Sequence, residues 1–233
     1  MSILIASFDI GKKNFAFVIE EVNVNSIKSI KNIPKKQRYN KDRTCKSEFQ
    51  HILNDLYKCG EVKLVCNLDL TYNCDSKKYL DKQTFINMNN ELDKYKEYWD
   101  KCDAFIIERQ MSFRNKRNTM AMKLGQHCYS YFTFYYANFK EIIDYPAYHK
   151  TQVLGAPKNF GKIEKTYKNG KTVQIKDNRK KWAVRIAEVI LKFRNDEKVL
   201  EQLIKDTKRD DISDCILMNI TYCYLKYLDN KKL

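Results

Sequence analysis

Four carboxylates occupy positions where an ordinary surface role is awkward. Asp9 ends the apolar run ILIASFD just before a turn glycine, and Glu108 ends the run AFIIE. Asp211 and Asp214 lie three positions apart at the start of an apolar helical segment, so they project from one face of that helix. Carboxylates at strand ends can meet at one edge of a sheet and share divalent cations, because Mg²⁺ prefers carboxylate oxygens together with water and phosphate. Two such cations about 4 Å apart activate a water and stabilise the leaving oxygen in phosphodiester hydrolysis.

Each of these residues also has an ordinary structural explanation. Asp210, Asp211 and Asp214 suit the N-terminus of a helix, where the helix dipole favours negative charge, and for these residues alone capping is the commoner role. Asp9 suits a turn, and Glu108 suits a surface ion pair. Chance explains the presence of all four acids in this order much less easily than it explains any one of them.

Hydrophobic periodicity predicts the elements that position these acids. Strands are expected at 3–9, 14–20, 62–70, 104–108 and 141–145, and helices at 46–58, 82–100, 114–137, 180–193 and 210–227. This order predicts an α/β fold with a mixed sheet covered by helices on both faces, in a single domain over residues 1–233. Residues 24–45 are expected as a loop or ragged strand, the stretch at about 24–100 as an insertion, and 155–181 as a basic loop.

Composition narrows the possible partners. Lys and Arg exceed Asp and Glu by fifteen, with a pI near 9.3, which points to a polyanion, either nucleic acid or an acidic membrane face. A lysine-rich composition that only keeps the protein soluble is the alternative. None of the six glycines forms a G-G or G-x-G pair, which argues against an actin-like or sugar-kinase-like ATPase. The eight cysteines include no C-x-x-C pair and no zinc-type spacing. No leader or membrane-spanning stretch is found, so we expect an intracellular protein in a reducing compartment.

Three segments carry a resemblance to a known family: SFDIGKKNFAF, AFIIERQM and KRDDISDCILM. Together they resemble the RuvC-type nucleases of the RNase H-like superfamily, and most closely the Holliday junction resolvases of poxviruses and related large DNA viruses. The resemblance implies that Asp9 is the first metal ligand and that Glu108 is the bridging ligand. It assigns Asp211 and Asp214, rather than Asp210, as the last two ligands.

The same resemblance implies a mechanism and an assembly. Viral members carry an essential lysine about thirty residues before the acidic helix, which makes Lys181 the expected catalytic lysine, with Lys180 as the alternative; either would stabilise phosphate charge or orient the attacking water. Two Mg²⁺ ions per site are implied, with Mn²⁺ able to replace them. The products would be 5′-phosphate and 3′-hydroxyl nicks in viral DNA recombination or concatemer processing. Paired nicks imply a homodimer, and poxvirus-like relatives imply action at the cytoplasmic site of viral DNA replication.

Basic residues around these segments are expected to contact DNA. The expected DNA-binding residues are Arg109, Arg114, Lys116, Arg117, Lys158, Lys162 and Lys180. Binding should therefore weaken steeply with salt. No base-reading motif is found, which favours recognition of DNA shape.

Two alternatives to a junction resolvase remain open. The first is a non-catalytic basic DNA-binding architectural protein in which the acids are incidental. The second is another RNase H-like nuclease that acts on flaps or hybrids, since these enzymes share the metal site and differ in groove shape.

Overall fold

Five strands form one twisted sheet at the centre of the molecule. The computed structural model describes residues 1–76, 78–110, 112–113, 116–166, 170 and 172–233. The order of the strands across the sheet is β3-β2-β1-β4-β7. These strands are β1 (Ser2–Asp9), β2 (Phe15–Asn23), β3 (Gly60–Leu68), β4 (Ala104–Arg109) and β7 (Glu141–Pro146). The first three pair antiparallel, and β4 and β7 then add parallel to β1.

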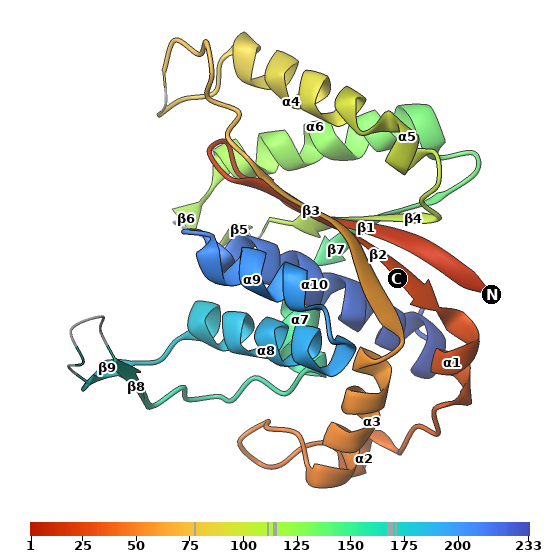
Figure 1. Ribbon diagram of the computed structural model, residues 1–233. Helices are drawn as coiled ribbons and strands as arrows, with labels where there is room; N and C mark the ends of the chain where they lie inside the picture. The colour runs from red at the N-terminus through yellow and green to blue at the C-terminus, as the bar shows by residue number, and fades with distance from the viewer. Residues whose placement is uncertain (77, 111, 114–115, 167–169, 171) are drawn as a thin grey trace.

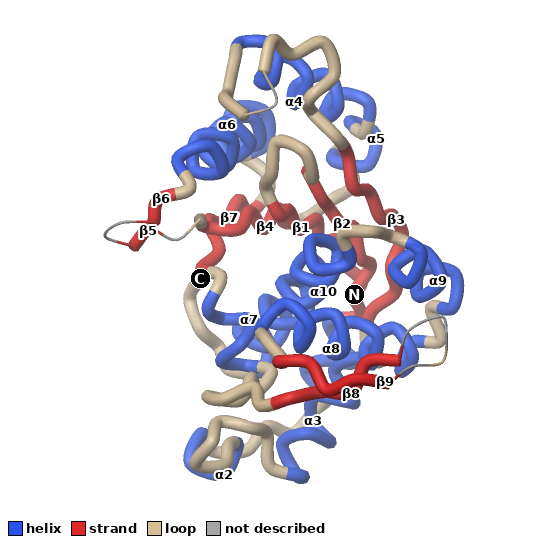
Figure 2. The backbone as a smooth tube through the Cα atoms, turned by 90° about the vertical axis from the view of Figure 1, so that its left-hand side faces the viewer, coloured by secondary structure: helices blue, strands red, loops and turns tan. Residues whose placement is uncertain are grey.

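Helices cover both faces of this sheet (Figures 1 and 2). On one face lie α4 (Lys82–Lys94), α5 (Lys96–Trp99) and α6 (Thr119–Tyr136). On the other face lie α1 (Val24–Ser29), α2 (Lys35–Arg38), α3 (Ser47–Tyr57), α7 (Tyr148–Val153), α8 (Arg179–Arg194), α9 (Glu197–Lys205) and α10 (Arg209–Cys223), which continues as the π-helix η1 (Tyr224–Leu228). The expected α/β class, with a mixed sheet between two helical layers, is confirmed.

Each face of the sheet has its own apolar core because side chains alternate along a strand. On β4, Phe105 and Ile107 face α6, while Ile106 faces the layer that contains α10. Phe105 and Phe132 of α6 stack with ring centroids 4.1 Å apart. Ile216 of α10 lies in the opposite core. The site residues described below stand at the end of strands that are packed on both sides.

The structure differs from the sequence prediction mainly in short elements. Residues 24–45, expected as a loop or ragged strand, contain the short helices α1 and α2, and α7 and α9 were not predicted. Helices this short are marginal in isolation, so their formation depends on tertiary packing that periodicity does not record. The stretch at 24–100 contains β3, an integral strand of the sheet, with helices before and after it.

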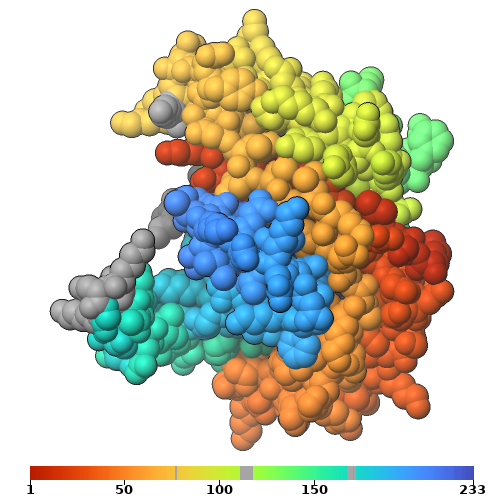
Figure 3. All heavy atoms as spheres, viewed as in Figure 1, coloured from red at the N-terminus to blue at the C-terminus, as the bar shows by residue number. Residues whose placement is uncertain are grey.

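The basic segment 155–181 is partly ordered as a hairpin of β8 (Lys162–Thr166) and β9 (Thr172–Lys176). In Figure 3 this hairpin projects from the side of the molecule. A second small ladder pairs β5 (Ser112–Phe113) with β6 (Lys116–Arg117), directly after β4. Both hairpins therefore extend from the body near segments that carry basic residues.

Candidate metal centre and active site

Three carboxylates from distant parts of the chain meet at one edge of the sheet. Parallel pairing places Phe8 of β1 opposite Ile107 of β4, so the next residues, Asp9 and Glu108, also lie side by side at the ends of these strands. Asp214 reaches the same place from the first half of α10. One potential ligand oxygen from each of the three lies within 4.8 Å of the others.

Hydrogen bonds fix α10 against the strand that carries Asp9. The Ser7 hydroxyl donates to the backbone carbonyl of Cys215 over 2.9 Å, and both residues are fully buried. The Cys215 thiol in turn contacts the carbonyl of Ala16 on β2, at 3.5 Å. Asp214 precedes Cys215, so these contacts set its position relative to the sheet edge.

The turn after Asp9 is held equally tightly. A Cβ atom at Gly11 would lie 2.6 Å from the carbonyl oxygen of Asn14, so this turn requires glycine. The next residue, Lys12, is buried and its ammonium donates to the carbonyls of Ser76 and Tyr79, at 2.6 Å each. The β1–β2 turn is therefore tied to the segment that leads into α4.

Lys150 of α7 is a site residue that sequence analysis missed. Its buried ammonium lies 2.7 Å from Glu108 Oε1 and 3.0 Å from Asp214 Oδ2. α7 begins two residues after β7, the strand that pairs with β4. A residue just beyond the carboxyl end of β7 is therefore close to the carboxyl end of β4, and this neighbourhood was the available sequence signal.

The candidate metal centre carries more negative than positive charge. Burial, followed by the charges of Glu108 and Asp214, raises the pKa of Asp9 well above its ordinary value. Burial also raises the pKa of Asp214, although Lys150 opposes the shift. Burial alone would lower the pKa of Lys150, but the negative charges of Glu108, Asp214 and Asp9 outweigh it and raise that pKa.

The donor set fits a divalent metal ion. Three carboxylates share one ammonium here, which leaves negative charge unbalanced in a partly buried site. Carboxylate oxygens are the ligands that Mg²⁺ and Mn²⁺ prefer. Asp9, Glu108 and Asp214 are therefore the residues that would hold the ion.

Asp211, the fourth expected ligand, stands outside this group of three among the residues that the structure describes. Burial and the neighbouring charge of Asp210 raise the pKa of Asp211 to about 6, and the charge of Asp214 adds to the shift. Asp211 is thus within electrostatic reach of the centre, one helical turn before Asp214. Its assignment as a ligand stays a prediction.

The two candidate lysines of α8 point to different partners. Lys180 forms an ion pair with Asp210, and this hydrogen bond, supported by the charges of Asp211 and Asp214, raises the pKa of Lys180. Lys181 instead donates from Nζ to the carbonyl of Lys176 over 2.7 Å. The structure therefore directs Lys180, not Lys181, toward the acidic helix, because the two positions differ by a large rotation about the helix axis. The catalytic role of Lys181 stays a prediction without a contact to the acids.

The described residues among those expected to bind DNA lie in two regions, one directly after the acidic end of β4 and one around the β8–β9 hairpin and the start of α8. Arg109 is half-exposed and forms an ion pair with Asp144 of β7, with Nε 2.6 Å from Oδ2. Lys116 and Arg117 form β6, of which only the backbone is described, and Arg114 lies outside the described residues. Lys158 is exposed in the segment that leads into the β8–β9 hairpin, Lys162 is exposed at the start of β8, and Lys180 is described above.

A basic pocket joins this hairpin segment to residues before α3. It has a volume of about 410 Å³ and contains Arg43, Lys158 and Arg179, together with the rings of Tyr39 and Phe160. The backbone N–H of Lys158 donates to the carbonyl of Asp42 over 3.0 Å, which holds the two segments together. Arg43 and Arg179 were not singled out from the sequence, because arginines in polar stretches resemble ordinary surface residues.

Comparison with known sequences shows to which family the chain belongs. No protein-family model matches it. It is 35% identical to the uncharacterized protein 170L of Invertebrate iridescent virus 6, over 98% of this chain and 92% of that protein. The chain belongs to the family of this viral protein. A further member of the 170L family, the uncharacterized protein 97L of Invertebrate iridescent virus 3, is 30% identical over 94% of this chain and 98% of that protein.

Comparison with solved structures identifies the fold of this 170L-family protein. Thermus thermophilus RuvC superposes with a TM-score of 0.54 at 10% identity, covering 98% of both chains. The expected RuvC-type, RNase H-like fold is confirmed by this likeness. A fowlpox virus resolvase, solved with its substrate Holliday junction DNA, aligns with a TM-score of 0.47 at 18% identity over 94% of this chain and 96% of that one. None of the helices in the described part of the chain combines the length and the hydrophobicity that a membrane span requires.

Proposed function

We propose that this protein is a metal-dependent endonuclease that cleaves branched DNA, with the four-way junction as its substrate. The observation that carries the proposal is the meeting of Asp9, Glu108 and Asp214 at one sheet edge, in a chain with a net charge of +15. A carboxylate cluster suits a divalent cation, and a basic protein suits a polyanionic substrate. The RuvC-type fold places both features on a scaffold that is compatible with nuclease chemistry.

Divalent Mg²⁺, when bound, supplies activation of the attacking water and neutralisation of the phosphate charge. Asp9, Glu108 and Asp214 would hold it, and Asp211 is the fourth carboxylate that we propose as a ligand. Lys150 keeps the Glu108 and Asp214 carboxylates in place through its two short contacts. The proposed cleavage products carry 5′-phosphate and 3′-hydroxyl ends.

Basic residues on the α8 side guide the DNA backbone toward the acids. Lys158, Arg43 and Arg179 line one pocket, and Lys162 extends this charge onto the hairpin. Lys180 lies at the border between this charge and the acidic helix. Contacts of this kind bind phosphates without regard to sequence.

A homodimer with paired sites would nick the two strands of a junction symmetrically. The end of α6 offers a suitable apolar face, because Phe134, Tyr135 and nearby Phe139 are 82%, 53% and 86% exposed. Large exposed apolar groups that cluster in this way mark interaction sites. We propose this face as the dimer contact. Both sequence relatives are viral proteins, and we propose that the enzyme acts in viral DNA recombination or concatemer processing at the intracellular site of viral replication.

The test is incubation with an end-labelled four-way junction, a flap, an RNA–DNA hybrid and linear duplex, each with Mg²⁺, Mn²⁺ or chelator. Ligatable paired nicks confined to the junction support the proposal. Asp9→Asn should abolish cleavage and retain junction binding, whereas Asp55→Asn, a change at an exposed carboxylate that pairs with Lys58, should leave both unchanged. Cleavage of flap or hybrid alone would overturn the junction assignment, and binding without cleavage would favour the architectural alternative.

A further inference from the structure

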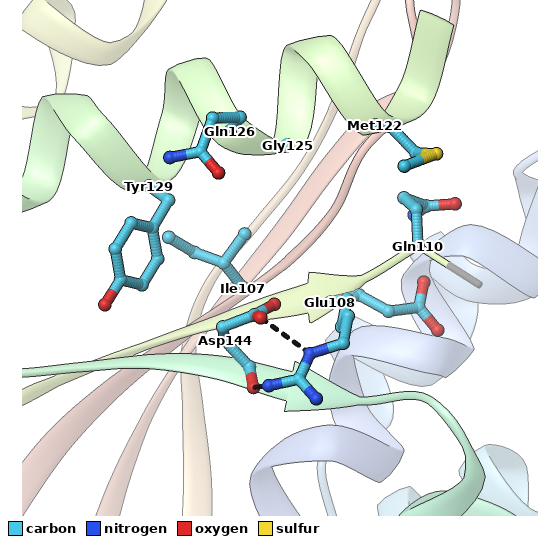
Figure 4. Close-up of a pocket in the computed structure, with 9 residues that line it drawn as sticks. Ile107, Glu108, Gln110, Met122, Gly125, Gln126, Tyr129 and Asp144 are labelled. Atoms are coloured by element: carbon cyan, nitrogen blue, oxygen red, sulfur yellow. Dashed lines mark hydrogen bonds and ion pairs between the residues drawn. The ribbon is translucent and has the colours of Figure 1, made fainter. Parts of the chain in front are cut away.

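A cavity of about 340 Å³ opens directly beside the metal centre, on the side of the sheet opposite to α10 (Figure 4). It lies between helix α6 and the carboxyl ends of β4 and β7. Ile107 rises from β4 toward the helix, and the Glu108 side chain marks one end of the cavity. An occupant of this cavity would therefore be the immediate neighbour of a group held at the acids.

Gly125 of α6 is one of the residues that line the cavity. Gly125 lies on the buried face of α6, yet a Cβ atom there would meet no heavy atom within 4 Å. Glycine in the middle of a helix costs about 1 kcal/mol relative to alanine. The helix thus leaves space that any larger residue would begin to fill.

The lining combines flat apolar surface with amide groups. Ile107, Met122 and the ring of Tyr129 supply apolar surface, and Gln110 and Gln126 supply amides. Aromatic rings stack on nucleobases, and a glutamine amide can pair with the edge of a base. The volume lies within the roughly 300–1,000 Å³ of small-ligand pockets, so it suits a single nucleotide and excludes a duplex.

Arg109 gives the rim of the cavity a positive group in a fixed place. Its Nε and Nη2 donate to Oδ2 and the backbone carbonyl of Asp144, at 2.6 and 3.1 Å. A guanidinium has five N–H donors, so this pairing leaves donors for a phosphate. The cavity and its rim therefore match both parts of a nucleotide.

We propose that this cavity receives one unstacked base of the bound DNA strand, adjacent to the phosphodiester held at the acids. The proposal deepens the endonuclease function and rests on it for the path of the strand. It adds a base-dependent contact to a protein whose other expected contacts are to phosphates. Tyr129 and the two glutamines are then the residues that determine which base is preferred.

The test is a binding series in chelator, so that no cleavage is required. Four-way junctions carry a single abasic site, moved one nucleotide at a time around the branch point. The proteins compared are wild type, Gly125→Leu, which places a bulky side chain in the cavity, and Gly125→Ala, a matched control that leaves most of it open. Tyr129→Ala removes the stacking ring by an independent route. Thermal unfolding followed by circular dichroism verifies that each variant is folded.

At one position, an abasic site should weaken binding by wild type and by Gly125→Ala about tenfold. Gly125→Leu and Tyr129→Ala should bind the intact junction about tenfold more weakly and show no further loss at that position. Equal affinity of wild type for every abasic junction would overturn the proposal, as would an undiminished abasic effect in both variants. Failure of the endonuclease proposal has a different signature: Mg²⁺-dependent nicking is absent, while the abasic site still weakens binding.

Discussion

Replacing Lys150 with methionine should destabilise the metal-free protein and make its stability depend on Mg²⁺. The Lys150 ammonium is buried and contacts Glu108 at 2.7 Å and Asp214 at 3.0 Å. Methionine has a similar length and keeps the packing, but it leaves the carboxylates without their counter-charge. Removing one partner of a buried ion pair costs about 3–5 kcal/mol.

The expected loss is large enough to measure by thermal unfolding. For a domain of this size, 1 kcal/mol shifts the melting temperature by about 2–4 °C, so Lys150→Met should lower it by about 6–20 °C in chelator. A ligand present at a hundred times its dissociation constant returns about 2.7 kcal/mol. Saturating Mg²⁺ should therefore restore about half of the loss or more, because the divalent ion replaces the missing positive charge.

Two controls make this prediction specific. Lys101→Met removes an exposed lysine and should change the melting temperature little in either buffer. Glu108→Gln combined with Lys150→Met should cost less than the sum of the single changes, because the buried negative charge is removed together with its partner. A melting temperature of Lys150→Met within about 2 °C of wild type in chelator would refute the reasoning, as would equal responses of both proteins to Mg²⁺.

Three further outcomes are expected. Burial and neighbouring charges hold the folded pKa of Asp9 above its ordinary value of 3.8, so metal-free wild type should lose unfolding free energy as pH rises through that folded pKa. The pKa values of Asp211 and Asp214 are raised as well, so Asp9→Asn should show a smaller loss than wild type in urea titrations between pH 4 and 8, and an equal loss would contradict the assignment. Arg194→Met should cost about 3–5 kcal/mol, because Glu20 is fully buried 3.0 Å away, whereas adding Glu20→Leu should recover most of that cost in the same titrations. Lys158→Ala should weaken junction binding and reduce the slope of log affinity against log salt by about one, and an unchanged slope would remove Lys158 from the DNA contact.

The positions of two of the acids could be predicted because they follow from local sequence. Asp9 and Glu108 each end a short, mostly apolar run, and such runs are typical of buried strands. Asp214 could be added because its helix is strongly apolar after the first turn. The structure brings these three carboxylates together.

The surroundings of the acids could not be predicted in the same way. Lys150 looks like a surface lysine in the sequence, and only its place after β7 reveals that it is buried between carboxylates. The choice between Lys180 and Lys181 depends on the rotational phase of α8, which periodicity leaves uncertain by about one residue. The cavity lined by Gly125 depends on the distance between α6 and β4, which no local sequence pattern encodes.

The three carboxylates belong to the first strand, a central strand and the last long helix. Contacts between segments so far apart in sequence close late in folding, since loop closure must precede them. A fragment that ends before α10 would possess two of the acids and lack the third. Under the proposed function, uptake of a divalent ion would therefore require the whole architecture, and a chain truncated before α10 would not cleave DNA.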